Sequence, residues 1–246
     1  MFNYLLKIEY NGKNFVGWQS QKNGNSIQDE IEKVLKKILK SKIKIIGAGR
    51  TDKGVHAFGQ YTCFKHYKKI ENRDKFLKSI NFFLSKKLIS VINIKAKKID
   101  FHARFNAKKR VYEYLIINRK SLLSIDKGRA WHVKKKIDMN LLRKGARIFK
   151  GTHDFSTFRA SSCSANSPVK KMESVIIRKN NEKIFIRFIS KSFLQNQVRS
   201  MVGCLKYLAT GKWSISEFKN VMKSKKRSRC APPAPAEGLY LMDVKY

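Results

Sequence analysis

The chain is organised around the stretch Gly47-Ala48-Gly49-Arg50-Thr51-Asp52-Lys53-Gly54-Val55-His56-Ala57. Its three glycines let the backbone turn tightly and let a ligand approach closely. Apolar residues alternate with lysines before it, at residues 43–45, and a second strand-like run follows at residues 58–64. The pattern therefore predicts a strand, a glycine-rich turn and a second strand. One acid, Asp52, lies at the crest of that turn between two cations.

The rest of the first half alternates strands and helices around this turn. Period-two alternation predicts strands, and apolar stripes behind capping residues predict helices. The predicted strands cover residues 2–10, 90–95 and 110–118, and the predicted helices begin at Ser26 and at Asn72 or Asp74. The order of elements is thus strand, helix, strand, strand, helix, strand.

The second half varies the same plan. Its predicted elements are a helix after Asp138, a hairpin of residues 173–179 and 184–189, a helix over residues 194–209, a capping box at residues 214–217 and a strand over residues 239–244. Mixed elements in this order predict an α+β fold, with two related halves of antiparallel sheet and packed helices. We place the halves at residues 1–106, which carry the Asp52 turn, and 107–246, which would complete a cleft with the first half. We expect the active cleft between them.

The charge of the chain indicates a polyanionic partner. Lys and Arg number 55 among 246 residues, against 17 Asp and Glu, which gives a formal net charge of +38. Nucleic acid is the commonest such partner. The alternative is compositional: an AT-rich coding bias also enriches Lys, Ile and Asn, so part of the excess could be solvated surface. Because the charge is spread along the whole chain, nucleic-acid binding is the preferred interpretation.

Other features of the composition point to a cytoplasmic protein. The first residues lack a basic segment followed by a long apolar run, and no apolar stretch has the length of a membrane span, so we expect no signal peptide and no membrane association. The four cysteines, Cys63, Cys163, Cys204 and Cys230, include no pair at CxxC spacing. We therefore expect no zinc site and a reducing compartment.

Several chemistries could explain the glycine turn. A phosphate-binding loop requires Lys and Ser or Thr after its second glycine, whereas Val55 and His56 follow Gly54 here. A dinucleotide-binding fingerprint requires a third glycine, and this stretch has Asp52 in its place. A metal site from Asp52, His56 and His102 has no characteristic ligand spacing. In the purely structural alternative, Asp52 accepts hydrogen bonds within the turn or pairs with a neighbouring cation.

Residues 49–57 resemble the signature of the tRNA pseudouridine synthase A family. Further blocks that resemble the family follow in family order along nearly the whole chain. They are Gly17-Trp18-Gln19 with Gln21, Phe101-His102-Ala103-Arg104, Arg110 with Tyr112 and Tyr114, Phe155 with Phe158-Arg159, Val198-Arg199 with Met201-Val202-Gly203, and Ala234-Pro235-Ala236 with Gly238-Leu239. Many members have Ala where this chain has Lys53, which is a local change beside the acid.

The resemblance implies an isomerase with the pseudouridine synthase fold. The family converts uridines 38, 39 and 40 of the tRNA anticodon stem-loop to pseudouridine, without a metal or an organic cofactor, and acts as a homodimer. The chemistry of the residues agrees. Cleavage of a glycosidic bond builds positive character on the sugar, which a carboxylate stabilises or traps. One acid suffices where no water is activated, so a lone Asp52 favours isomerisation over hydrolysis.

The resemblance also assigns roles to residues outside the turn. Arg199 resembles the arginine that pairs with the catalytic acid, and Arg50 is the local cation that would keep Asp52 ionised. A uridine in a stem must leave the stack to react, and Tyr112 resembles the aromatic residue that stacks on it. Tyr114 stays ambiguous, because most such tyrosine pairs lie in a core. His56 and His102 are expected to be hydrogen-bonding supports.

Two rival functions remain at the level of sequence. A non-catalytic RNA-binding protein would explain the charge and the aromatic residues but not an acid on a glycine turn. A metal-dependent nuclease would be inhibited by chelators and would cleave RNA.

Overall fold

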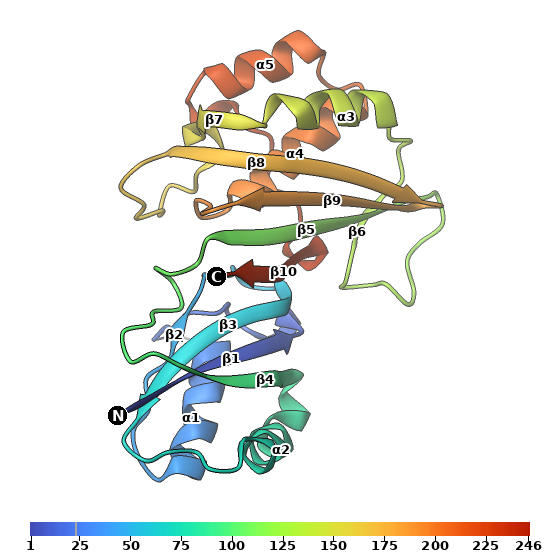
Figure 1. The fold of residues 1–246 in the computed structure, drawn as a ribbon. Coiled ribbons are helices and arrows are strands. Elements are labelled where there is room, and N and C mark those ends of the chain that lie inside the picture. Colours follow the sequence, from blue (N-terminus) through green and yellow to red (C-terminus); the bar gives the residue numbers. More distant parts are fainter. Residues whose placement is uncertain (23) are drawn as a thin grey trace. The chain divides into compact units, whose positions relative to one another are not determined.

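The computed structural model describes residues 1–22 and 24–246, which divide into two units. Unit 1 contains Met1–Lys108 and Tyr240–Tyr246, and unit 2 contains Lys109–Leu239. Each unit combines a sheet with helices (Figure 1), which confirms the predicted α+β class. In the part of the chain that is described, no helix has the length and apolar character needed to cross a membrane.

The sheet of unit 1 has the strand order β4-β1-β3-β10, with the short β2 paired to β3. The pairs β1–β3, β1–β4 and β2–β3 are antiparallel, and Leu6 lies opposite Thr62 and Ile94. Helices α1 and α2 pack side by side against this sheet (Figure 1). The elements are β1 (Phe2–Tyr10), α1 (Ile27–Leu39), β2 (Ile46–Gly47), β3 (His56–His66), α2 (Arg73–Leu84), β4 (Ile89–Lys97) and β10 (Leu239–Lys245).

The helices of unit 1 begin where their side chains satisfy the first free backbone N–H groups. Ser26 accepts a hydrogen bond from the Asp29 amide at 3.0 Å, and Asn72 accepts one from the Lys75 amide at 2.8 Å. The apolar stripes of these helices then close the core. Ile27, Ile31, Leu35, Ile80 and Leu84 are fully buried together with Leu6 and Ile8 of β1.

Unit 2 has the strand order β5-β9-β8-β7, with β6 paired to β5. Helices α3, α4 and α5 gather on one side of the sheet (Figure 1). The β8–β9 hairpin turns at Asn181, which has φ +51°. The elements are β5 (Lys109–Asn118), β6 (Trp131–Val133), α3 (Met139–Ile148), β7 (Gly151–Asp154), β8 (Val169–Asn180), β9 (Lys183–Ser190), α4 (Gln197–Ala209) and α5 (Ile215–Lys223).

The last strand differs from its predicted place. We assigned residues 107–246 to one half, but β10 pairs with β3, where Tyr240 lies opposite His56 and Leu241 opposite Ala57. This pairing is parallel, as is β5–β6, whereas the other strand pairs described above are antiparallel. The final residues of the chain therefore belong to unit 1. His56 and Ala57, which directly follow the Asp52 turn, pair with a strand that is distant in the sequence.

The strand expected before the glycine turn is also shorter than predicted. Ile43 and Ile45 are buried, but only Ile46 and Gly47 pair with β3. The Ile45 amide donates instead to the Glu32 carboxylate of α1 at 3.1 Å. The Glu32 side chain thus accepts the hydrogen bond from the Ile45 amide that a partner strand would otherwise have accepted.

Candidate active site

Asp52 lies on a four-residue turn. The Val55 amide donates to the Asp52 carbonyl oxygen at 3.1 Å, and Gly54, the third residue, has φ +79°. A type II turn requires a positive φ at this position, which explains the glycine. Asp52 is half-buried, while its neighbour Lys53 is exposed. The turn therefore presents a half-buried aspartate beside an exposed lysine.

A second segment of the chain holds the base of this turn. Gly17 forms an isolated antiparallel bridge with Asp52, and the Trp18 amide donates to the Thr51 carbonyl oxygen at 3.1 Å. Gly17 has φ +120°, and a Cβ on it would lie 2.7 Å from that same carbonyl oxygen. Only a glycine lets the two backbones approach this closely. The Gly17-Trp18-Gln19 block is thus the structural partner of the Asp52 turn.

Side chains fix the turn from two more directions. The Tyr10 hydroxyl of β1 and Thr51 Oγ1 are hydrogen-bonded at 2.7 Å, and both residues are buried. On the far side of Asp52, His56 Nδ1 accepts a hydrogen bond from the Gly12 amide at 3.0 Å. The His56 ring stacks on Tyr240 of β10 at 4.9 Å between centroids. His56 is therefore a support of the turn, as the sequence suggested.

The Tyr10–Thr51 hydrogen bond should be measurable as a coupling energy. We expect Tyr10→Phe and Thr51→Val each to lower the free energy of unfolding, and the double variant to lose about 1 kcal/mol less than the sum of the two, because the shared bond is lost once. Urea unfolding of the four proteins measures this cycle. Strict additivity would show that the two hydroxyl groups are not coupled.

Arg50 is tied to the segment that holds the turn. Its Nε donates to Gln19 Oε1 at 3.1 Å, and its side chain is exposed. The Gln19 amide nitrogen in turn donates to Gln28 of α1 at 3.0 Å. Arg50 thus lies in the same unit as Asp52, held by a chain of polar groups that leads to α1. Its action on the carboxylate stays a prediction.

The two tyrosines of β5 in unit 2 have different surroundings. Tyr112 is 7% exposed, and its ring meets Phe193 edge-on at 5.1 Å between centroids. Tyr114 is fully buried, donates to the Pro235 carbonyl oxygen at 2.7 Å and lies against Gly238, where a Cβ would be 2.6 Å from its ring. Burial raises the pKa of the Tyr114 phenol well above its usual value. Tyr114 is therefore a core residue, which resolves the ambiguity left by the sequence.

Arg199 lies in the first turn of α4, also in unit 2. Its Nε donates to the Ala234 carbonyl oxygen at 2.8 Å, and its Nη1 donates to Asn196 Oδ1 at 3.2 Å. The Ala234 amide donates back to the Arg199 carbonyl oxygen at 3.0 Å. The Arg199 residue is half-buried and is therefore held by these contacts against the segment that contains Ala234. Asp52 and Arg50 thus belong to unit 1, Tyr112 and Arg199 to unit 2, and their joint action stays a prediction.

His102 is bound within its own loop. Its Nδ1 accepts from the amides of Arg104 and Phe105 at 3.2 and 3.3 Å, and its ring stacks on Phe105 at 4.3 Å. Within residues 1–22 and 24–246, no three His, Cys, Asp or Glu side chains are grouped so that they could hold a metal ion.

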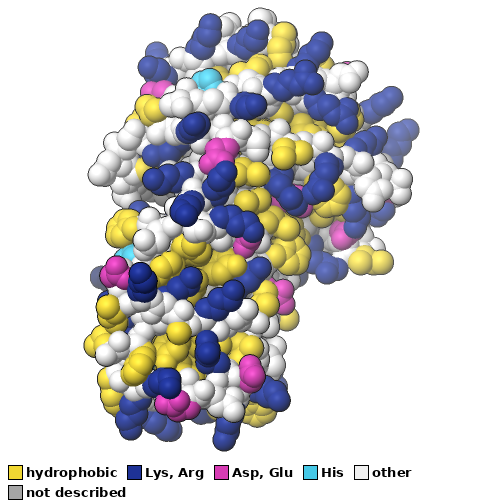
Figure 2. Space-filling model, in the orientation of Figure 1, with side chains coloured by type: hydrophobic (Ala, Val, Ile, Leu, Met, Phe, Trp, Pro, Cys, Tyr) yellow, Lys and Arg dark blue, Asp and Glu magenta, His cyan; other side chains and the backbone are white. Residues whose placement is uncertain are grey.

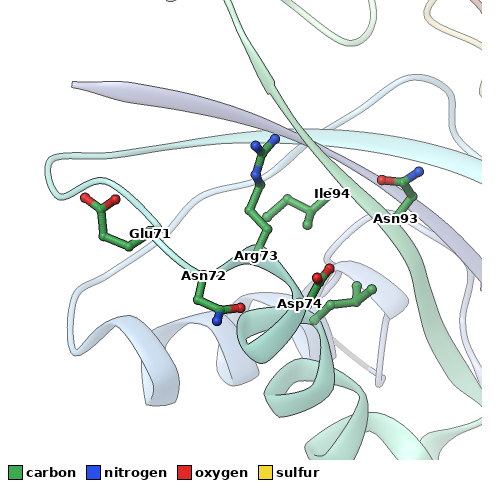
Figure 3. A pocket seen from close by; sticks show the side chains of 7 residues that line it. Glu71, Asn72, Arg73, Asp74, Asn93 and Ile94 are labelled. Carbon is green, nitrogen blue, oxygen red and sulfur yellow. The ribbon is translucent and has the colours of Figure 1, made fainter.

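A polar cavity of about 480 Å³ lies elsewhere in unit 1, between the start of α2 and β4 (Figure 3). Its lining includes Arg73 and Asp74 of α2 and Asn93 and Ile94 of β4. None of the four residues assigned to the site from the sequence lines it. Asp74 therefore offers a control carboxylate in the same unit as Asp52.

On the face shown in Figure 2, the positive charge is not gathered in one place. Figure 2 shows Lys and Arg side chains over the visible surface of each unit, with few acids among them. This distribution agrees with a polyanionic partner.

Comparison with known proteins identifies the family. The model of the family described as tRNA pseudouridine synthase matches residues 7–106 and 146–246. A protein of Pelagibacter ubique (strain HTCC1062) named tRNA pseudouridine synthase A is 57% identical over 246 residues, 100% of either chain. Its namesake in Maricaulis maris (strain MCS10) is 41% identical over 243 residues, which are 99% of this chain and 97% of the relative. The resemblance seen in the motifs is confirmed, and the chain belongs to the tRNA pseudouridine synthase family.

Proposed function

We propose that this chain is a tRNA-modifying isomerase that converts uridines 38, 39 and 40 of the anticodon stem-loop to pseudouridine, with Asp52 as the catalytic carboxylate. Family membership supports the activity. The observation that carries the assignment of Asp52 is its turn. A half-buried aspartate lies on a type II turn that is joined at its base to a second glycine-containing segment. So many constraints on one acid are typical of a preorganised reacting group.

The reaction conserves all atoms of the nucleoside. The bond between N1 of uracil and C1′ of ribose breaks, the base turns over, and C5 bonds to C1′. The proton that leaves C5 is balanced by the proton that N1 gains. Asp52 stabilises or traps the positive character that develops at the sugar when the first bond breaks. Arg50 and Arg199 are the cations assigned to keep that carboxylate ionised.

The substrate must open for this chemistry. A uridine paired in a stem is flipped out of the stack before it reacts. We assign Tyr112 to stack on the uracil, and its edge-on contact with Phe193 supports a ring held in one orientation. Contacts with phosphates would supply most of the affinity for tRNA, so that affinity should fall steeply with salt. The resemblance further implies a homodimer.

Mapping of pseudouridine tests the proposal directly. Unmodified tRNA is incubated with the purified protein, and pseudouridine is located along the RNA. We expect it at positions 38, 39 and 40 wherever these are uridines, without RNA cleavage and without inhibition by chelators. Unchanged uridine with intact tRNA binding would favour the non-catalytic RNA-binding protein. Cleaved RNA would favour the nuclease.

Variants of Tyr112 test the stacking role. Tyr112→Leu should lower kcat/KM by roughly 5- to 150-fold, because stacking of a base on an aromatic ring contributes about 1–3 kcal/mol. Tyr112→Phe keeps the ring and should retain tRNA affinity. If it nevertheless loses kcat, the hydroxyl takes part in the reaction, for which the C5 proton is the candidate. Tyr114→Phe is the control: it removes a buried hydrogen bond to Pro235 and should lower stability while kcat/KM is kept.

A further inference from the structure

Two cysteines of unit 2 lie against each other, although 26 positions separate them in the chain. Sγ of Cys204, in the middle of α4, is 3.4 Å from Sγ of Cys230. Cys230 directly follows η4, the short 3₁₀ helix Arg227–Arg229. Neither Cys204 nor Cys230 is part of a disulfide bond. Their separation is about 1.4 Å longer than a disulfide bond, so small rotations of the side chains would bring the sulfur atoms to bonding distance.

The two thiols are chemically unequal. Cys204 is fully buried, and its hydrogen bond with Cys230, together with burial, raises the pKa of Cys204. The same hydrogen bond lowers the pKa of Cys230, and the charge of Arg227 lowers it further against the cost of burial. Cys230 is also partly exposed. The pair therefore combines an accessible thiol that favours the thiolate with a protonated thiol behind it, which is the arrangement of an attacking and a resolving cysteine.

The backbone around the pair is already in close contact. Arg227 Nη1 donates to Ser200 Oγ of α4 at 3.1 Å. One turn further along, a Cβ on Gly203 would lie 2.1 Å from the Pro232 carbonyl oxygen. Arg199 and Ala234 exchange the two hydrogen bonds described above. The segment 227–234 thus lies along α4 on both sides of the cysteine pair, so a bond between the sulfur atoms would fit this arrangement without bringing distant segments together.

We propose that Cys204 and Cys230 form a modification site for peroxides, which oxidise the pair to an intramolecular disulfide. The Cys230 thiolate attacks one oxygen of hydrogen peroxide and forms a sulfenic acid, with hydroxide as the leaving group. The Cys204 sulfur then attacks the Cys230 sulfur, and its proton and the departing hydroxyl leave as water. Two thiols lose two electrons and two protons in total, and the peroxide is reduced to two molecules of water. A dithiol reductant reverses the step by exchange.

The bond would join α4 to a segment rich in cations. Lys225, Lys226, Arg227 and Arg229 precede Cys230, and Ala234, the acceptor for Arg199, follows it. The chemistry of the pair does not depend on the proposed function. An effect on tRNA modification would depend on it, so the test below measures the thiols and not the activity.

Peptide mapping of the oxidised protein is the test. The full chain is treated with hydrogen peroxide, the remaining thiols are alkylated, and the protease digest is analysed by mass spectrometry with and without dithiothreitol. We expect a cross-linked peptide pair that contains Cys204 and Cys230 and disappears on reduction, with both thiols lost to alkylation at equal rates. Protein in which both cysteines remain alkylatable, or form bonds only between chains, would overturn the proposal.

Single substitutions order the two steps. In Cys204→Ala, Cys230 has no resolving partner and also loses the hydrogen bond that lowers its pKa, so dimedone should trap a sulfenic acid at Cys230 that forms more slowly than the disulfide of the unsubstituted protein. In Cys230→Ser, oxidation of Cys204 should slow by at least about tenfold, because burial shields the remaining thiol and raises its pKa. Circular dichroism verifies that each variant is folded, and the map of the unsubstituted protein decides the question if one is not.

Cys163 is the matched control within the same unit. Burial raises its pKa, but hydrogen bonds with the backbone of Ala165 and Gln195 and the charge of Arg159 lower it by more. It therefore shares the favoured thiolate of Cys230 but not the thiol neighbour. Oxidation of Cys163 to a disulfide as fast as the Cys204–Cys230 pair would show that thiolate character alone, and not the pairing, determines the reaction.

Discussion

We expect Asp52→Asn to lower the kcat of pseudouridine formation by at least about a thousandfold and to leave tRNA binding intact. The amide has nearly the shape of the carboxylate and can keep the backbone geometry of the turn, since the Val55 amide bonds to the main-chain oxygen of residue 52. The substitution removes the negative charge that, in the proposed mechanism, meets the developing positive charge on the sugar. Removal of a group that acts only in the transition state lowers kcat without a matching rise in KM. Release of the C5 hydrogen from tRNA measures the rate, and filter binding measures the affinity.

Asp74→Asn is the matched control for this substitution. It makes the same chemical change in the same unit, on an exposed acid that lines the cavity of Figure 3. We expect its kcat and KM to stay within about twofold of the unsubstituted protein, because surface substitutions of this kind change little. If Asp52→Asn retained its activity, Asp52 would not be the catalytic group. If Asp74→Asn lost activity as well, the polar cavity would have to be part of the site.

The helices that could be predicted from the sequence are those whose starts are determined locally. Their N-cap residues are Ser26 for α1, Asn72 for α2, Asp138 for α3 and Ser214 for α5, and the side chain of each accepts a hydrogen bond from a backbone N–H two or three residues later. α4 differs. The apolar stripe placed its start at residue 194, but the helix begins at Gln197, after Asn196 with φ +62° and without a side-chain cap. Where no local cap exists, tertiary packing determines the boundary.

The place of β10 and the support of the Asp52 turn could not be predicted from the sequence, because both depend on contacts between distant segments of the chain. The alternation in residues 239–244 predicts a strand but contains nothing about its partner, and the parallel pairing with β3 joins positions far apart in the chain. The bridge between Gly17 and Asp52 is likewise a meeting of two backbones. The only signal in the sequence was that Gly17-Trp18-Gln19 and residues 49–57 both resemble family blocks. That signal marks both segments as important without showing that they touch.

For the site, the chemistry of single residues was easier to predict than their surroundings. The acid on a glycine turn drew attention to Asp52 because acids are scarce in this chain. The different surroundings of Tyr112 and Tyr114 could not be predicted, because the two residues are two positions apart in β5 and share one face of the strand. It depends on Pro235 and Gly238, which approach Tyr114 from a loop more than a hundred residues away.

Gly203→Ala should lower the free energy of unfolding by about 2 kcal/mol. The added methyl would lie 2.1 Å from the Pro232 carbonyl oxygen, so the segment that follows η4 must move away from α4. Overpacking of this kind costs about 3 kcal/mol or more at its upper range, and the higher helix propensity of Ala returns only about 1 kcal/mol. The movement would also open the paired hydrogen bonds between Arg199 and Ala234. Urea unfolding followed by far-ultraviolet circular dichroism measures the loss.

Gly145→Ala separates this explanation from a general intolerance of larger residues in the core. Gly145 is also a helical glycine of unit 2, and a Cβ on it would lie 2.6 Å from Leu208 Cδ2 and 2.9 Å from Leu205 Cδ2. Those atoms are the ends of side chains, which can rotate, whereas the Pro232 oxygen is fixed to the backbone. We expect Gly145→Ala to stay within about 1 kcal/mol of the unsubstituted protein, because the gain in helix propensity offsets the repacking. Equal losses in the two variants would mean that core volume, and not the backbone contact with α4, requires glycine at residue 203.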